Sequence, residues 1–170
     1  LSSSSAASDV YKRQLPKGDY DAVIVIGDGL SATAVMQNAV PVAQALLARL
    51  GGMKLAPLVI ATQARVALGD DIGAALGAKL VVMLIGERPG LTVSDSLGIY
   101  LTFDPKRGTP DSARNCISNV HGQGGLSAEA AADMLAWLMR EALRRGLTGV
   151  GLKEASGLTH EGAAPLLVEG

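Results

Sequence analysis

The stretch that decides the fold is Asp21 to Ala32, which reads DAVIVIGDGLSA. Residues 22–26 are a short apolar run rich in β-branched side chains, the pattern of a strand buried on both faces. The run ends at a Gly-Asp-Gly turn, and Ser31 follows at the position of a helix N-cap. A strand, a tight turn and a helix start in this order predict a β-α unit.

The turn itself has two interpretations. Gly27, Gly29 and Ala32 satisfy the G-x-G-x-x-A pattern of a dinucleotide-binding turn, and the free N–H groups of a helix start bind phosphate. That pattern also needs an acid after the next strand, where residues 61–63 read Ala-Thr-Gln. The alternative is a plain β-α turn in which Ser31 is a cap; GDGLS is not the G-x-S-x-G nucleophile elbow.

Apolar runs and helical patterns alternate along the rest of the chain. We expect further strands at 58–61, 79–85 and 97–103, and helices at 31–50, 70–77 and 127–145. Strands that are nearly continuous aliphatic runs, alternating with helices, predict an α/β domain with a mostly parallel sheet and helices on both faces. Ligands of such sheets bind at the carboxyl ends of the strands, which here are followed by loops 27–31, 63–66 and 86–90.

The composition limits the classes of function. The chain has 170 residues, 48% hydrophobic but only 3% aromatic, which predicts a single domain with an aliphatic core. Its net charge of −1 gives no footprint for nucleic acid or an anionic membrane, and no apolar run approaches membrane-spanning length. Cys116 is the one cysteine, so we expect no intrachain disulfide, no cysteine-based zinc site and a reducing compartment.

The two ends of the chain differ from the middle. Residues 1–14, LSSSSAASDVYKRQ, are serine-rich and without periodicity, which predicts a leader that is disordered or foreign to the domain. Residues 154–170 lack a periodic pattern as well, and we expect a loose tail there. The domain is therefore expected over residues 15–153.

Glu87 and Cys116 are the side chains most relevant to function. Glu87 directly follows a buried strand, where it either pairs with Arg88 in a rigid turn or accepts hydrogen bonds from a ligand. Cys116 is expected in a polar loop over 106–119. A lone cysteine is usually a small buried apolar group, and as a nucleophile it would need a base, for which His121 is the nearby candidate.

No other residues complete a catalytic or metal-binding set. Asp70 and Asp71 open a helix, where acids favour the positive helix end, and we expect them to be surface acids and not metal ligands. We expect no catalytic residue and no metal ligand in this chain. Binding is favoured over independent chemistry.

Five blocks of the sequence, taken together, resemble the small subunit of ethanolamine ammonia-lyase: IGDGLSA, QARVALGDDIG, LIGERPGL, DSLGIYLTF and RNCISNV. The match runs from about Tyr20 to Lys153. The resemblance implies an adenosylcobalamin-dependent lyase that converts ethanolamine to acetaldehyde and ammonia. It also implies a hetero-oligomer, in which a large barrel subunit holds the substrate and a Rossmann-like small subunit closes over the corrinoid.

The resemblance further implies three cofactor-binding residues. Val66 would pack against the ring system, Glu87 would accept hydrogen bonds from corrinoid amides, and Cys116 would make a close contact without bonding cobalt. The family has a helical region before the first strand, where this chain has residues 1–14. The expected location is the cytoplasm, with enclosure in a bacterial microcompartment left open.

Two other functions compete with this one. The first is a non-catalytic nucleotide- or phosphate-binding module that uses the Gly27 to Ser31 turn. The second is a free-standing cysteine hydrolase built on Cys116.

Overall fold

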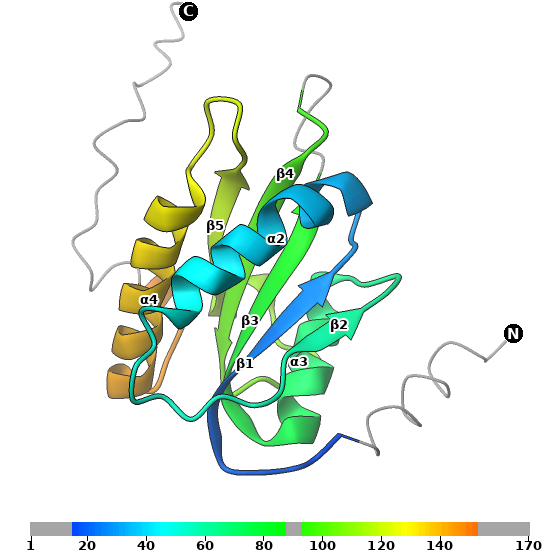
Figure 1. Cartoon of the computed structure of the whole chain (residues 1–170). Coiled ribbons are helices and arrows are strands. Elements are labelled where there is room, and N and C mark those ends of the chain that lie inside the picture. The colour runs from blue at the N-terminus through cyan, green and yellow to red at the C-terminus, as the bar shows by residue number, and fades with distance from the viewer. Residues whose placement is uncertain (1–14, 88–92, 153–170) are drawn as a thin grey trace, which may run out of the picture.

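The computed structural model describes residues 15–87 and 93–152 (Figure 1). The expected leader and tail, and Arg88, lie outside these residues. The described residues form, in chain order, β1 (Tyr20–Gly27), α2 (Ala32–Leu47), β2 (Val59–Ala61), α3 (Val66–Leu76), β3 (Ala78–Glu87), β4 (Ser96–Phe103), the 3₁₀ turn η1 (Asp111–Ala113), β5 (Arg114–Val120) and α4 (Ala128–Arg145).

The sheet of the described residues is mixed, with the strand order β2-β1-β3-β4-β5. β1 pairs in parallel with β2 and β3, whereas the β3–β4 and β4–β5 pairings are antiparallel. The α/β class is confirmed, but the expectation of a mostly parallel sheet is wrong. The reason is connection length: 88–95 and 104–113 are shorter than the roughly dozen residues that a parallel crossover needs.

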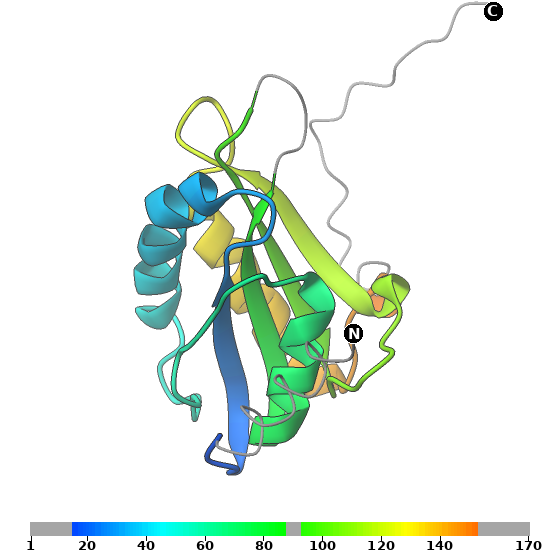
Figure 2. The same cartoon turned by 90° about the vertical axis from the view of Figure 1, so that its right-hand side faces the viewer.

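Helices cover both faces of the sheet, as the sequence predicts. α2 and α4 pack on one face and α3 packs on the other, so the sheet forms the middle layer (Figures 1 and 2). Residues alternate between the two sides: Ile24 belongs to the cluster under α2 and α4, and Val25 to the cluster under α3. Both clusters are aliphatic, as the composition indicates.

The helix ends follow local signals. Ser31 and Ser127 cap α2 and α4, each accepting a hydrogen bond from the backbone N–H three residues on. Gly146 ends α4 in the left-handed conformation, with φ 69°. None of the helices in the described residues is long and apolar enough to span a membrane.

Candidate functional site

The carboxyl ends of β1, β2 and β3 meet at one edge of the sheet, because these strands are parallel. α3 covers β1 and β3 on its face. Beside it, the same face of β4 and β5 carries the half-buried Tyr100 and the exposed Cys116 and Ser118. This surface, which we call the open face, lies next to the strand-end loops at which ligands of α/β sheets bind.

Glu87 ends β3 and lies on the side of the sheet that continues into the open face. The Tyr100 hydroxyl donates a hydrogen bond to Glu87 Oε1. The Glu87 side chain passes over Gly98 of β4, where an added Cβ would lie 2.6 Å from the carboxyl carbon and 2.7 Å from each carboxyl oxygen. The backbone of β4 and one phenol therefore fix the position of this carboxylate.

Cys116 lies in β5, directly opposite Tyr100 in the β4–β5 register. The expectation of a loop at this residue is wrong: β5 begins at Arg114, directly after the 3₁₀ turn at residues 111–113. Loss of solvent raises the pKa of the Cys116 thiol; the neighbouring Tyr100 hydroxyl opposes this shift, and the negative charge of Glu87 adds to it. Tyr100 thus lies between Glu87, to which it is hydrogen-bonded, and Cys116, its cross-strand neighbour.

The environment of Cys116 does not favour a nucleophile. Only the thiolate is an effective nucleophile and metal ligand, and a raised pKa keeps the thiol protonated at neutral pH. His121, the candidate base, is buried and its Nε2 is hydrogen-bonded to Asn119 Oδ1 at 2.8 Å. The arrangement supports a contact role for Cys116 rather than covalent catalysis.

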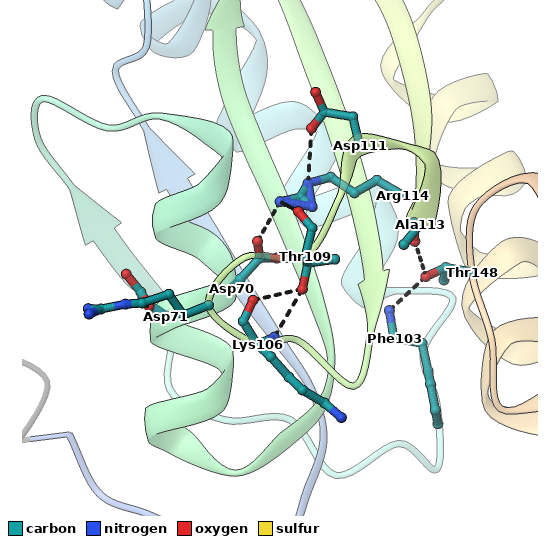
Figure 3. A network of polar contacts seen from close by, with 10 residues as sticks. Asp70, Asp71, Phe103, Lys106, Thr109, Asp111, Ala113, Arg114 and Thr148 are labelled. Carbon is teal, nitrogen blue, oxygen red and sulfur yellow. Dashed lines mark hydrogen bonds and ion pairs between the residues drawn. The ribbon is translucent and has the colours of Figure 1, made fainter.

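Val66 is the first residue of α3, one helical turn before Asp70. Asp70 forms an ion pair with Arg114 of β5, 2.5 Å between Oδ2 and Nη2 (Figure 3). Arg114 lies opposite Thr102 of β4 in the register. Val66 and Tyr100 are both partly buried against the aliphatic cluster under α3.

The burial of the Asp70–Arg114 pair contradicts the expectation that Asp70 is a surface acid. Asp70 lies in the second turn of α3 and not at its start, and its side chain is 2% exposed, with that of Arg114 4% exposed. Asp71 also lies in the second turn, but its side chain is 23% exposed and its partner Arg107 is largely exposed. Burial raises the pKa of Asp70, and the positive charge of Arg114 opposes that shift.

Sequence reasoning missed two residues of the site, Gly98 and Tyr100. Both lie in a strand that was expected from its alternating pattern, but neither was assigned a function. An alternating strand after a connection too short for a parallel crossover would have indicated antiparallel pairing with 79–85. That pairing would have brought β4 beside Glu87, although the register itself needs the structure.

The glycines of the Gly27–Ser31 turn serve close packing. An added Cβ at Gly27 would lie 2.6 Å from Met83 Cε. Gly29 has φ 57°, and its Cβ position is occupied by the backbone of Gly86. These contacts match the plain β-α turn interpretation.

Asp28, inside this turn, opposes its use as a phosphate cradle. Its two carboxylate oxygens accept hydrogen bonds from the backbone N–H groups of Gln63 and Ala64, each at 2.8 Å. These bonds lower the pKa of Asp28, which keeps the carboxylate charged. A fixed negative charge beside the start of α2 repels a phosphate group, and Ser31 already accepts from the Ala34 N–H.

A cavity of about 480 Å³ lies at the opposite end of the sheet, between the 104–110 loop and the 146–148 turn. Its charged side chains are paired within the chain: Lys106 with Asp104, and Arg107 with Asp71. Thr148 closes one side, accepting from the Phe103 N–H and donating to the Ala113 carbonyl. We interpret this region as structural.

The described residues contain no cluster of three or more His, Cys, Asp or Glu side chains suited to a metal ion. The open face presents the Glu87 carboxylate as a hydrogen-bond acceptor. Beneath it, Ser96, opposite Glu87 in the register, has a buried hydroxyl without a partner among the described residues. Such a buried hydroxyl indicates unused hydrogen-bonding capacity at this edge of the sheet.

Comparison with known proteins identifies relatives over most of the chain. The family model described as ethanolamine ammonia-lyase light chain (EutC) matches residues 3–153. An ethanolamine ammonia-lyase small subunit of Rhodopseudomonas palustris (strain BisA53) is 54% identical over 146 residues, 85% of this chain and 56% of the relative. One of Azotobacter vinelandii (strain DJ / ATCC BAA-1303) is 52% identical over 161 residues, 90% and 59% of the two chains. The chain thus spans little more than half the length of these curated relatives.

Proposed function

We propose that this chain, which belongs to the ethanolamine ammonia-lyase light-chain family, provides the cofactor-contacting domain of an adenosylcobalamin-dependent lyase. The observation that carries the proposal is the grouping of Glu87, Tyr100 and Cys116 on one open face. Val66, at the start of α3, packs against the same aliphatic cluster as Tyr100. Val66, Glu87 and Cys116 are the cofactor contacts that the family resemblance implies, and this grouping supports the proposal.

The chemistry of these residues fits a corrinoid, whose rim carries amide side chains. Glu87 holds a carboxylate as acceptor for amide N–H groups, and Val66 presents an apolar surface to the ring. The Cys116 thiol contributes a small, polarisable contact and stays protonated, so it does not bond cobalt. When bound, adenosylcobalamin supplies homolysis of its cobalt–carbon bond, while the protein binds, orients and excludes water.

The substrate and the partner follow from the family. We propose that a large subunit holds ethanolamine and that this chain covers the cofactor from the open face, forming a hetero-oligomer that releases acetaldehyde and ammonia. In this arrangement the cytoplasm is the natural location, since Cys116 is the single cysteine and a free thiol persists in a reducing compartment.

The test is co-purification of the tagged full chain with a large subunit from a family member, followed by an assay for ammonia released from ethanolamine with and without adenosylcobalamin. We expect a complex whose ammonia release needs both the large subunit and the cofactor. Ammonia release by this chain alone would overturn the division of labour. A stable complex that binds cobalamin no better with this chain than without it would overturn the cofactor role.

A further inference from the structure

Tyr100 occupies the centre of the open face. It lies in β4 with Met83 of β3 opposite on one side and Cys116 of β5 opposite on the other. Its hydroxyl donates to Glu87 Oε1, and Cys116 is its direct cross-strand neighbour. A single phenol therefore lies beside both polar residues through which the site is proposed to bind its cofactor.

Gly98 makes the Tyr100–Glu87 contact possible. Ile85 is the register partner of Gly98, so Glu87 projects from the next position of β3 on the same face and lies back over the glycine. Any side chain at position 98 would meet the carboxylate, because an added Cβ would approach its three terminal atoms to 2.6–2.7 Å. The glycine provides space, and the phenol provides the hydrogen bond that selects one orientation.

The hydrogen bond from Tyr100 determines which Glu87 oxygen faces a ligand. Oε1 is occupied by the Tyr100 hydroxyl, and no described side chain donates to Oε2. A glutamate side chain that is free to rotate loses conformational entropy when a ligand immobilises it, at a cost of about 0.5–1.5 kcal/mol. A glutamate already held by a phenol loses less.

We propose that Tyr100 is a positioning residue for cofactor binding, which, together with Gly98, holds the Glu87 carboxylate against the sheet and presents its second oxygen to an amide donor of the corrinoid. The inference rests on the proposed function. It adds a residue that acts through Glu87 and not by touching the cofactor itself.

The test measures the affinity of the assembled two-subunit protein for cyanocobalamin by equilibrium dialysis, which needs no turnover. Tyr100→Phe removes the hydroxyl alone, and we expect cyanocobalamin to bind about threefold to tenfold more weakly, the entropy cost above expressed as a ratio. Glu87→Ala removes the acceptor, and we expect a loss of about tenfold or more. Tyr20→Phe is the matched control, since Tyr20 lies at the start of β1, and its affinity should equal that of the unmodified protein.

The double variant Glu87→Ala/Tyr100→Phe distinguishes positioning from a separate contact. If Tyr100 acts through Glu87, the double variant binds no more weakly than Glu87→Ala alone, whereas independent roles give additive losses. Gly98→Ala is a second test that keeps the phenol. It displaces the flexible end of Glu87, and we expect a loss similar to that of Tyr100→Phe with an unchanged melting temperature.

The outcomes distinguish a failure of the Tyr100 positioning role from a failure of the proposed function. Normal affinity in Tyr100→Phe and Gly98→Ala, with weakened binding in Glu87→Ala, overturns the positioning role and leaves the proposed function intact. Additive losses in the double variant overturn positioning as well. Normal affinity in Glu87→Ala overturns the proposed cofactor site itself.

Discussion

Replacing Asp70 by alanine tests the buried ion pair that ties α3 to β5. The Asp70 and Arg114 side chains are 2% and 4% exposed, so the substitution leaves a buried guanidinium without its counter-charge. Breaking one side of such a pair costs about 3–5 kcal/mol. The remaining partners of Arg114 are the Thr109 carbonyl at 2.9 Å and the exposed Asp111 at 3.7 Å, and neither replaces a buried carboxylate.

A loss of this size is a large share of the roughly 5–15 kcal/mol that stabilises a typical domain. At about 3–4 °C per kcal/mol for a domain of this length, we expect Asp70→Ala to lower the melting temperature by about 10–20 °C. The assay is thermal and urea unfolding followed by circular dichroism. Asp71→Ala is the matched control: its ion pair with Arg107, 3.4 Å long, is solvent-accessible and is worth about 0–1 kcal/mol.

The double variant Asp70→Ala/Arg114→Met completes the test. Removing both charges leaves no buried ion, and replacing a buried pair by apolar side chains is often neutral, so we expect most of the lost stability to return. If Asp70→Ala proves no more destabilising than Asp71→Ala, the reasoning from burial is refuted.

Three further predictions follow from single contacts. Gly149→Ala should lower the urea midpoint much more than Gly52→Ala. Both glycines have positive φ, a conformation that costs an alanine about 1–2 kcal/mol. Only at Gly149 would the added Cβ also meet backbone, 2.7 Å from Ala113 Cα, so equal midpoints would contradict this prediction. Burial raises the pKa of Tyr100 above the ordinary 10.0, and the hydrogen bond to Glu87 raises it further. Above pH 10 the folded state therefore keeps a proton that the unfolded state loses, so the contribution of this group to stability declines as the pH rises. In an ultraviolet titration of the folded chain, the absorbance change at pH 10 should therefore be the same in Tyr100→Phe as in the unmodified protein, because Tyr100 does not ionise at that pH; a smaller change in the variant would contradict this. Asp28→Ala should cost about 1–2 kcal/mol at neutral pH, by analogy with a lost helix cap. Because the folded pKa of Asp28 is below 3.8, its contribution is present above that pH and is lost as the pH falls through the folded pKa; a difference from the unmodified protein that does not shrink as the pH falls below 3.8 would argue against the two backbone hydrogen bonds as the cause.

The elements predicted correctly are those whose signals are local. β1 is a β-branched run closed by a glycine turn, and α4 combines an apolar stripe with a serine cap, arginines in its last turn and a terminal glycine. Each of these features acts within a few residues of the chain, so neither packing nor register is needed to interpret it. The short connection before β4 also indicated its antiparallel direction, but the alternation of helices and strands elsewhere favoured a parallel sheet.

β5 could not be predicted from its pattern for a physical reason. One of its sides packs Ile117 and Val120 against the α2–α4 cluster, and the other side belongs to the open face. Between these two residues the register shifts, and Asn119 takes a positive φ of 62°, so the apolar positions are three apart and not two. A half-covered strand with an irregular register looks like a polar loop in the sequence.

The same property that hid β5 supports the proposed site. A strand whose second side is covered by a helix would carry an apolar residue at position 116 or 118, as β3 does at Met83 and Ile85 under α3. Instead, β5 has a thiol and a hydroxyl there, beside a phenol that binds a carboxylate. Polar and small groups of this kind suit a surface that meets a broad ligand with donors at its rim. In this interpretation, the part of the sheet least predictable from the sequence is the part whose packing partner is a cofactor and not the chain itself.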